Sequence, residues 1–502
     1  MKKYITYVLM VFLYSLGGHA QSIDDILRYS RSELKGTARY VSMGGAFNAI
    51  GGDLSAINDN PAAAAVILKS EIGLTLNSLY NKVNANYLGK SNSVDSRSSN
   101  LDQFGLVFVL NDTSESDFTK LTFTYNYQHE QFFNAKFNAI ATNPNKGLDD
   151  YFLAFANGIP YSDIKTYDDE TISQSYQILG ENNGFSSQQA FLGFQGYVIS
   201  PVKFEDDNTQ YVSNSNPQGQ SVDHDFFVTH SGKNNKHSFS FATQYKKNLY
   251  LGFNFNSHSS RFRRIDNLEE SNYGSGSSFK TTEFENNILS VGEGFSFQMG
   301  AIYKTNNNFR LGLSYQSSVW YKMIDEFLQY ISSSRSSGKD MVDPQVINIY
   351  EYSLYTPSRF SGGLAYVFGS KGLISFQYDR VNYQNTSFDI GNGDTNFMNQ
   401  NKKINKTLKP AGTVRIGGEY RIGHISLRAG YFNQESINKT LLDLSKGTSF
   451  GLGYDFGRSV LNFALSNIEY QHSESIYQNG FTDTIQLNKD QVQFLVSYSF
   501  KL

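Results

Sequence analysis

The last residues of the chain alternate between apolar and mostly polar side chains and so predict a β-strand with one apolar face. The alternating positions are Val492, Phe494, Val496, Tyr498, Phe500 and Leu502. Successive side chains of a strand point to opposite faces, so all of these positions share one face. A closing strand with one lipid-facing side is typical of a transmembrane β-barrel. A soluble β-sandwich could end in the same way, so the rest of the chain must decide.

The first residues predict export. Lys2 and Lys3 precede an apolar run over residues 4–16, followed by small residues up to Ala20. This pattern predicts a signal peptide over residues 1–20, cleaved after Ala20. The run is shorter than the roughly 20 residues that a membrane-spanning helix needs. The chain contains no cysteine, which excludes disulfides and thiolate chemistry.

The composition fits a barrel better than a soluble domain. The chain has 34 Tyr, 40 Phe and 42 Gly beside 8 Pro and 1 Trp, and its mean hydropathy is −0.42. A barrel explains this combination because apolar lipid-facing residues alternate with polar lumen-facing ones. The net charge of −3 gives no reason to expect nucleic-acid binding.

Period-2 runs bounded by turn residues predict fourteen strands, an even number that suits a bacterial barrel. They cover residues 70–85, 101–110, 120–133, 236–246, 249–265, 288–304, 308–323, 358–368, 372–388, 412–422, 424–434, 447–456, 459–472 and 490–502.

The predicted connections form two classes. Those after even-numbered strands are mostly tight turns, such as residues 247–248, 369–371 and 457–458, whereas those after odd-numbered strands are long, such as residues 86–100 and 134–235. Short turns on one rim and long loops on the other are typical of an outer-membrane barrel and argue against a soluble sandwich. We therefore predict an all-β fold, a 14-stranded antiparallel transmembrane β-barrel over residues 70–502.

One predicted strand carries its charges on a single face. Arg415, Glu419 and Arg421 alternate with apolar residues and glycine. A cation on the lipid face near the midplane would cost about 2 to 4 kcal/mol, so these side chains should face the lumen. We expect them to pair with charges of a plug or of the opposite wall; tuning of pore selectivity is the alternative.

Residues 21–69 look unlike barrel wall. They combine a short predicted helix with small-residue stretches around Gly44, Gly45 and Phe47, and later Asn60, Pro61 and Ala62. Glycine permits tight turns, and a residue before proline is held extended. We therefore predict a compact piece with several sharp bends.

The chain resembles the FadL-like outer-membrane transporters, which include the TodX type of aromatic-hydrocarbon channel. The resemblance rests on residues 42–47 (SMGGAF), 55–62 (SAINDNPA), 356–366 (TPSRFSGGLAY), 415–420 (RIGGEY) and 427–431 (LRAGY). It touches residues 21–69 and the second half of the barrel, and residues 134–235 have no counterpart.

The resemblance implies that residues 21–69 form an N-terminal hatch inside the barrel. It also implies that this hatch-plugged barrel takes up hydrophobic small molecules, such as long-chain fatty acids, by diffusion across the cell outer membrane. Asn60, Pro61 and Ala62, with Gly44, Gly45 and Phe47, would then be hatch or gating residues. Equally, Asn60 and Pro61 could simply lock the plug, since both are turn residues. We expect a monomer in contact with outer-membrane lipid, with no metal and no cofactor.

The insertion over residues 134–235 carries two aromatic groups, which include Phe152 and Phe155 at helical spacing and Phe191 and Phe194 after them. At an extracellular position these four could bind the hydrophobic ligand, or they could form the core of a lid, which is the commoner arrangement. The nearby histidines have no metal-binding spacing.

The sequence carries none of the motifs of hydrolases, metalloproteases or nucleotide-binding enzymes, so we predict no catalytic residues and no enzyme activity. The main alternative to transport is a barrel that acts as a protein-binding accessory of a secretion or assembly machine, with partners held by its extracellular loops. The sequence does not identify the cargo.

Overall fold

The structure is a computed structural model that describes residues 23–111, 116–305, 308–389, 395–441 and 443–502. The predicted signal peptide, residues 1–20, lies outside these ranges.

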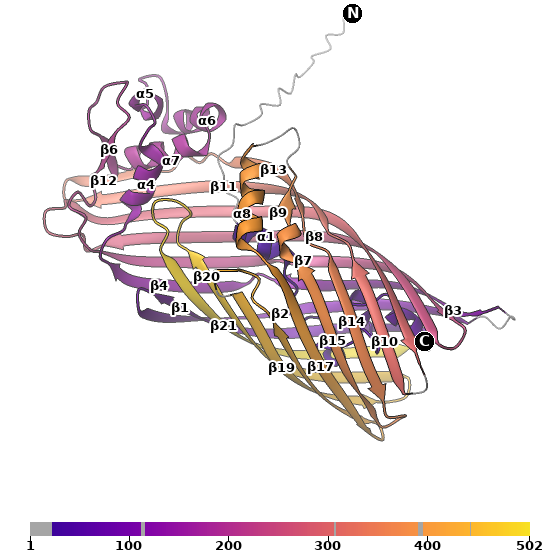
Figure 1. Ribbon diagram of the computed structural model, residues 1–502. Helices are drawn as coiled ribbons and strands as arrows, with labels where there is room; N and C mark the ends of the chain where they lie inside the picture. The colour runs from indigo at the N-terminus through magenta and orange to yellow at the C-terminus, as the bar shows by residue number, and fades with distance from the viewer. Residues whose placement is uncertain (1–22, 112–115, 306–307, 390–394, 442) are drawn as a thin grey trace, which may run out of the picture.

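The chain forms a closed antiparallel β-barrel of fourteen wall strands, as predicted (Figure 1). The first strand, β1 (Glu71–Tyr87), pairs on one edge with β2 (Lys90–Asn111) and on the other with the last strand, β21 (Thr484–Lys501). Closure removes both edges of the sheet, so each wall strand finds hydrogen-bond partners without water.

Eight further wall strands are continuous: β3 (Phe118–Phe132), β7 (Val222–Tyr245), β8 (Leu249–Ser271), β9 (Phe279–Lys304), β17 (Pro410–Ile422), β18 (Ile425–Gln434), β19 (Asp443–Asp455) and β20 (Ser459–Ser475). Three more each consist of two segments: β10 (Phe309–Gln316) with β11 (Trp320–Arg335), β13 (Asn348–Tyr355) with β14 (Arg359–Val367), and β15 (Gly372–Asn382) with β16 (Ser387–Phe388). Pro357 lies at one of these interruptions, where a missing N–H does not break a ladder. Shorter strands are β4 (Ala135–Asn143), β5 (Ile199–Pro201), β6 (Tyr211–Ser213) and β12 (Gly338–Val342).

The tight turns are confirmed, but the strands extend further toward the other rim than predicted. Residues 86–100, predicted as a loop, belong to the β1–β2 hairpin, whose turn residues Leu88 and Gly89 have φ of 46° and 77°. Strand β7 begins at Val222 inside the predicted insertion 134–235, and β4 pairs with it. Polar residues lie on both faces of these extensions, so no alternation marked them.

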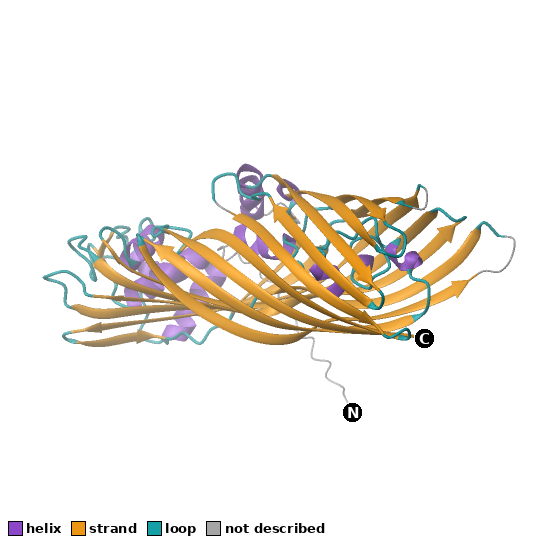
Figure 2. Cartoon of the chain, turned by 90° about the horizontal axis from the view of Figure 1, so that it is seen from below, coloured by secondary structure: helices purple, strands orange, loops and turns teal. Residues whose placement is uncertain are grey.

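Helices cap the rim opposite the short turns. They are α4 (Leu148–Ala156), α5 (Tyr161–Ile164), α6 (Ile172–Asn182) and α7 (Phe185–Gln195), which we call the lid (Figures 1 and 2). Helix α8 (Thr395–Thr407) and a short 3₁₀ turn, η2 (Tyr383–Asn385), lie between β15 and β17. Within the described ranges, every helix is too short or too polar to cross a membrane.

The N-terminal part forms the hatch: α1 (Ile23–Ser30), α2 (Ala38–Ser42), η1 (Ala56–Asn58) and α3 (Ala63–Val66). Its apolar side chains, including Phe47, Ile57 and Ala64, form one buried cluster with wall residues such as Val107 and Leu495. The barrel core is therefore filled by the start of the chain.

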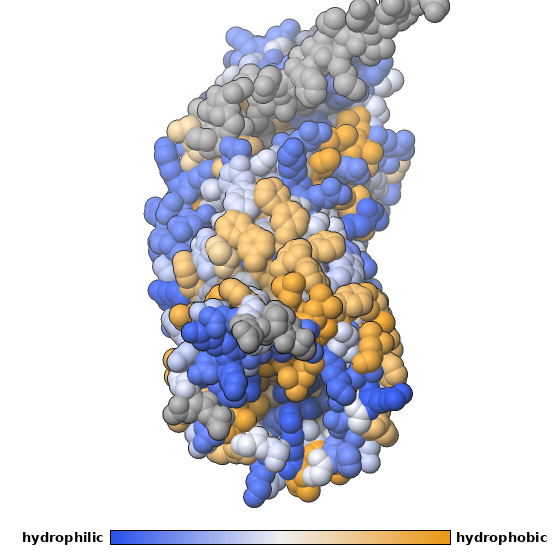
Figure 3. Space-filling view, turned by 90° about the vertical axis from the view of Figure 1, so that its right-hand side faces the viewer, coloured by the Kyte–Doolittle hydropathy of each residue, from blue (hydrophilic) through white to orange (hydrophobic). Residues whose placement is uncertain are grey.

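The outer face of the wall is apolar. On β8, Phe253 and Phe255 are 41% and 48% exposed, whereas the alternate residues Asn254 and Asn256 are buried. Figure 3, seen from the short-turn side, shows hydrophobic residues through the middle and along the right-hand side of the molecule, interspersed with hydrophilic residues. Apolar outside and polar inside is the pattern of a strand that separates lipid from a polar lumen.

Because the outer face is apolar, we expect an added charge to cost more free energy near the middle of the membrane than near its edges. Leu364 on β14 is 51% exposed in the apolar belt, so Leu364→Arg should destabilise the folded barrel by about 2 to 4 kcal/mol. Urea unfolding in lipid vesicles measures this. The control is Ser91→Arg on β2, an exposed position opposite Asn86 and beyond the aromatic Tyr80, which should change stability little. Equal costs at the two positions would contradict the placement of the belt.

Candidate functional site

A ring of inward-facing glycines seats the hatch. A Cβ added at Gly300 would lie 1.9 Å from the Asn60 side-chain oxygen, and one at Gly430 would lie 2.1 Å from the Gly44 nitrogen. A Cβ added at any of seven further glycines would also lie within 3.0 Å of a hatch atom; these are Gly73, Gly105, Gly252, Gly312, Gly363, Gly417 and Gly451. Only glycine lets the hatch backbone approach the wall this closely.

Inward amide side chains of the wall satisfy the backbone of the hatch. Asn254 donates to the Ile57 carbonyl at 2.9 Å, and Gln298 donates to the Asp59 carbonyl at 2.9 Å. Because the hatch has little regular structure, its carbonyls would otherwise be buried without partners, at a cost of about 1 to 3 kcal/mol each. The polar lumen thus replaces water for the plug.

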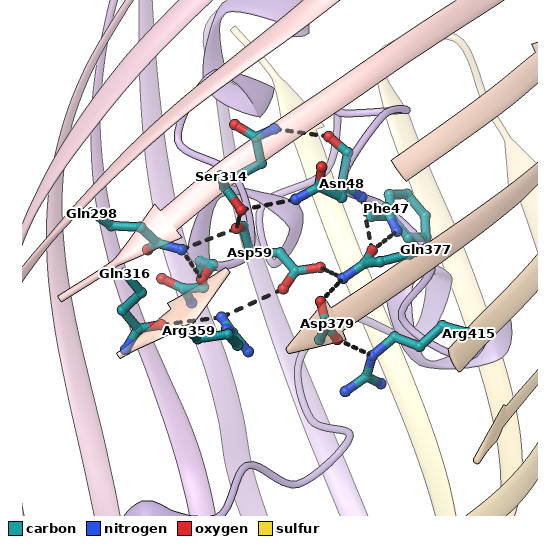
Figure 4. Close-up of polar contacts among 12 residues, drawn as sticks. Phe47, Asn48, Asp59, Gln298, Ser314, Gln316, Arg359, Gln377, Asp379 and Arg415 are labelled. Atoms are coloured by element: carbon teal, nitrogen blue, oxygen red, sulfur yellow. Dashed lines mark hydrogen bonds and ion pairs between the residues drawn. The ribbon is translucent and has the colours of Figure 1, made fainter. Parts of the chain in front are cut away.

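Gln377 on β15 holds two separate segments of the hatch together (Figure 4). Its oxygen accepts hydrogen bonds from the backbone N–H groups of Phe47 and Asn48, at 3.0 and 2.9 Å. Its nitrogen donates to the Asp59 carboxylate at 2.8 Å and to Asp379 at 2.9 Å. One buried amide therefore uses both ends to bridge hatch and wall.

Two arginines of the wall balance these carboxylates. Arg415 lies 2.9 Å from Asp379 and also donates to the Gly44 carbonyl at 3.2 Å, while Arg359 lies 3.5 Å from Asp59 (Figure 4). Burial, together with the neighbouring Asp379 carboxylate, raises the pKa of Asp59 above its usual value. Removing one partner of such a buried network leaves an uncompensated charge, so the network fixes the position of the hatch.

A second ion pair joins hatch and wall nearer the short turns. Arg39 of α2 lies 2.9 Å from Glu419, which is also bound by Arg428 at 2.6 Å. The predicted inward orientation of Arg415 and Glu419 is confirmed, and Glu419 has the predicted charge partner in the plug. The carboxylate partner of Arg415 is instead Asp379 of the neighbouring wall strand, and Arg421 pairs with Glu419.

The predicted hatch residues lie together. The Asn60 side chain donates to the carbonyls of Asn48, Ala301 and Leu313, at 2.8, 3.2 and 3.3 Å, and accepts from the Ala62 N–H. Pro61 packs against Gly252, which has no room for a side chain. Gly44 and Gly45 have φ of 62° and 73°, and Phe47 is fully buried. A gating role for these residues remains a prediction.

The glycine ring yields a test. Gly300→Val should push Asn60 off β9 and loosen the hatch, because the added Cβ would overlap the amide. Gly362→Val is the matched control, since its Cβ would meet only Leu313 at 3.7 Å. We expect faster proteolysis of the hatch and larger ion conductance in planar bilayers for Gly300→Val alone. Unchanged conductance would show that the glycine is not needed to seat the hatch.

The predicted aromatic residues of the insertion form the core of the lid. Phe152 of α4 and Phe191 of α7 are fully buried in one apolar cluster, and Phe155 and Phe194 pack against it. The structure brings all four together, far along the barrel from the hatch (Figure 1). Ligand binding by these four residues remains a prediction.

Buried polar residues anchor the lid to the wall. Glu270 at the end of β8 accepts a hydrogen bond from the first N–H of α4, that of Leu148, at 2.7 Å, and His224 of β7 lies 3.2 Å from the same oxygen. The next lid residue, Asp149, is buried beside Glu270. Burial and the Glu270 carboxylate raise the pKa of Asp149 to about 7.

This pKa shift predicts a pH dependence of lid docking. Asp149 has a pKa of about 4 when the lid is undocked, so the undocked state loses the proton first as pH rises from about 4 to 7. Docking is therefore weakened over this range and stays weak above it. Asp149→Asn should stabilise the docked lid at pH 8, by up to about 4 kcal/mol, and have little effect at pH 4.

Hydrogen exchange of α4 at the two pH values measures this effect. Asp168→Asn, at an exposed position of the lid, is the control and should leave exchange unchanged. At each pH, exchange in the Asp149→Asn variant is compared with exchange in the parent protein. If the substitution slowed exchange more at pH 4 than at pH 8, the assignment would be contradicted.

A cavity of about 220 Å³ lies in the lumen beside α1 and the segment that follows it. Its apolar lining includes Val83, Phe132, Phe133, Phe137 and Phe262, and its charged lining includes Arg28, Arg31, Glu33, Arg264, Asp443 and Glu474. Arg264 is paired with Asp266 at 2.8 Å and with Glu474 at 3.3 Å. The cavity therefore combines aromatic side chains with charged groups, of which Arg28 lies 3.5 Å from the centre of the Phe262 ring. Apolar side chains with a few polar groups are the usual lining of a small-molecule site.

The wall is discontinuous next to this cavity. The β2–β3 ladder ends at the pair Gln103 and Gln128, and beyond it residues 90–102 of β2 pair only with β1. The chain leaves β3 at Phe132 and resumes as β4, which pairs with β7 but not with β2. Among the described strands, this is a place where neighbouring strands, β2 and β4, lie side by side without a hydrogen-bonded ladder between them.

Sequence reasoning missed several residues of the site. Gln377, Asp379 and Arg359 lie on predicted strands, but nothing in their spacing marks them as partners of the hatch. The glycine ring left a weak signal, because glycine in a strand interior often marks a close approach of another backbone.

Comparison with known proteins shows the same fold. A Pseudomonas aeruginosa FadL homologue matches with a TM-score of 0.56 and 11% identity, over 94% of this chain and 99% of that one. The P. putida toluene transporter TodX matches with a TM-score of 0.50 and 14% identity, over the same shares of the two chains. At these identities the likeness shows the fold alone. No protein-family profile and no curated protein sequence matches the chain.

Proposed function

We propose that this protein is an outer-membrane channel for passive uptake of hydrophobic small molecules. The apolar outer belt, the polar plugged lumen and the fold shared with a FadL homologue and a toluene transporter support this function.

The observation that carries the proposal is the lumen cavity at the break in the wall. Val83 of β1, Phe132 of β3 and Phe137 of β4 line the cavity and lie on both sides of the break. A hydrophobic molecule held there can leave sideways into the bilayer without crossing the hatch. Such a route suits apolar cargo, because lipopolysaccharide slows its direct entry into the outer leaflet and the aqueous periplasm does not dissolve it.

The lining favours cargo with a long or aromatic apolar part and one polar end. Phenylalanines supply the apolar lining, and Arg28 and Arg31 line the same cavity. The Arg28 guanidinium lies 3.5 Å from the centre of the Phe262 ring, and Arg31 is paired with Asp443. A long-chain fatty acid fits this distribution, with its carboxylate toward the arginines. TodX transports toluene, and a neutral aromatic molecule would use the apolar side alone.

Uptake by vesicles containing the purified protein tests the proposal. Labelled long-chain fatty acid should enter faster than in protein-free vesicles, and Ala135→Trp, which fills the cavity beside the break, should slow uptake several-fold. Ala301→Trp is the control, because Ala301 lies on the lipid-facing side of β9. Uptake equal to that of protein-free vesicles would overturn the function, and equal uptake by the two variants would overturn the route.

Protein docking is the second candidate. The β5–β6 segment that follows the lid exposes three apolar residues: Val202 is 51%, Phe204 70% and Val212 49% exposed. Three residues are far fewer than the roughly 20 to 30 a side of a typical partner interface, so transport is the better supported function.

A further inference from the structure

Three cations stand on the outer face of the barrel wall beyond the apolar belt. They are Lys233 on β7 and Arg261 and Arg263 on β8, all exposed. Lys233 lies directly opposite Arg261 in the ladder, and Arg263 is the next outward residue along β8. We call these three residues the basic patch.

No described carboxylate forms an ion pair with the cations of the basic patch, although Glu285 on β9 interacts electrostatically with Arg263. Among the described residues, no carboxylate lies within 4.0 Å of any of the three; Arg263 donates only to the Asn287 amide, at 3.1 Å. The adjacent Arg264, which points inward, is bound to Asp266 and Glu474. Like charges directly opposite on a sheet destabilise it, so the patch gains from an anion that the protein does not supply.

The height of the patch identifies the kind of anion. Phe255 is the last aromatic residue on the lipid-facing side of β8, and beyond it Val291 of β9, opposite Arg261, is an exposed apolar residue. About six residues separate it from Arg261, roughly 20 Å along the strand and about 15 Å along the membrane normal for a tilt near 45°. A phospholipid headgroup extends only about 5 to 7 Å beyond the hydrocarbon. Even with its long side chain, Arg261 lies above most of that layer.

Acidic residues limit the patch on its far side. Asp225, Glu269 and Glu283 lie in one row across β7, β8 and β9, further toward the lid. This row repels anions beyond the patch, so attraction for phosphate is confined to a narrow height.

We propose that the basic patch binds the phosphorylated sugar headgroup of a glycolipid, the lipopolysaccharide of the outer leaflet. Its headgroup carries phosphates on sugars that rise well above the hydrocarbon, where the patch lies, and arginine binds phosphate through two parallel hydrogen bonds. The proposal rests on the outer-membrane location contained in the proposed function. Lys136 on β4, exposed and next to the break in the wall, extends the cationic surface toward the cargo exit.

The test compares glycolipid binding by purified full-length mature protein in detergent. The probe is bisphosphorylated lipid A carrying two core sugars, with binding measured by microscale thermophoresis. The patch variant is Lys233→Gln with Arg261→Gln and Arg263→Gln, and we expect its affinity to be about tenfold to hundredfold lower. The control variant removes three exposed cations elsewhere, Lys90→Gln, Lys203→Gln and Lys339→Gln, and should bind like the parent protein.

Three further arms identify the anion. Dephosphorylated lipid A and phosphatidylglycerol should bind the parent protein and the patch variant equally, and inorganic phosphate should not displace the glycolipid. Equal binding of phosphorylated lipid A by parent and patch variant overturns the proposal. Two results overturn the assignment to a glycolipid. One is that the patch variant loses phosphatidylglycerol binding as much as lipid A binding, and the other is that inorganic phosphate fully displaces lipid A.

Two controls keep the test decisive. A heat-modified gel shift reports folding, and Arg261→Gln alone, expected to weaken binding several-fold, replaces the triple variant if that variant does not fold. Fatty-acid uptake by vesicles free of glycolipid should be equal for parent and patch variant. A barrel that binds glycolipid through the patch but takes up no cargo would refute the transport function and leave this site intact.

Discussion

The hydrogen-bonded closure between β1 and β21 is the constraint on which the rest of the molecule depends. In hydrocarbon an unpaired backbone group costs several kcal/mol, so the sheet has to meet itself. Sixteen residue pairs, from Glu71 with Lys501 to Asn86 with Gln486, join the first strand to the last. Once the sheet is closed, every second side chain faces the interior, and what fills that interior decides what can pass.

The hatch fills the interior, and the inward-facing wall residues suit a plug with little regular structure. Hatch carbonyls need donors, and inward Asn and Gln side chains supply them. The hatch backbone also needs space, which the glycine ring provides at the entropic cost of glycine in a strand. Buried charges such as Asp59 are accepted because Gln377 and Arg359 compensate them. So many short contacts favour a hatch that moves little, which makes the sideways route beside β3 the simpler path for apolar cargo.

The lipid-facing part of each strand was predictable because apolar and polar residues must alternate there. The extensions toward the lid were not: in residues 86–100 both faces meet water or other polar groups, so the strand carries no period and read as a loop. The hatch was recognisable as a compact segment, and Asn60 and Gly44 were found within it. Its partner Gln377 was not, because a contact between residues 318 positions apart leaves no local pattern. The lid helices follow from the spacing of Phe152 and Phe155, yet that spacing is the same for a ligand site and for a core.

The arginines on the two sides of the wall differ in whether they are paired with a carboxylate. Inside, where the dielectric is low, Arg415, Arg428 and Arg264 each have a carboxylate within hydrogen-bond distance, since an unpaired ion there would be expensive. Outside, Arg261 and Arg263 have none, although Glu269 stands on the same face of the same strand. An exposed cation costs little on its own, so its lack of a partner is not a defect of packing. Its position, about 15 Å along the membrane normal from the last aromatic residue of β8, relates it to the layer that surrounds the barrel. A barrel wall is therefore specified as much by its membrane as by its own interior.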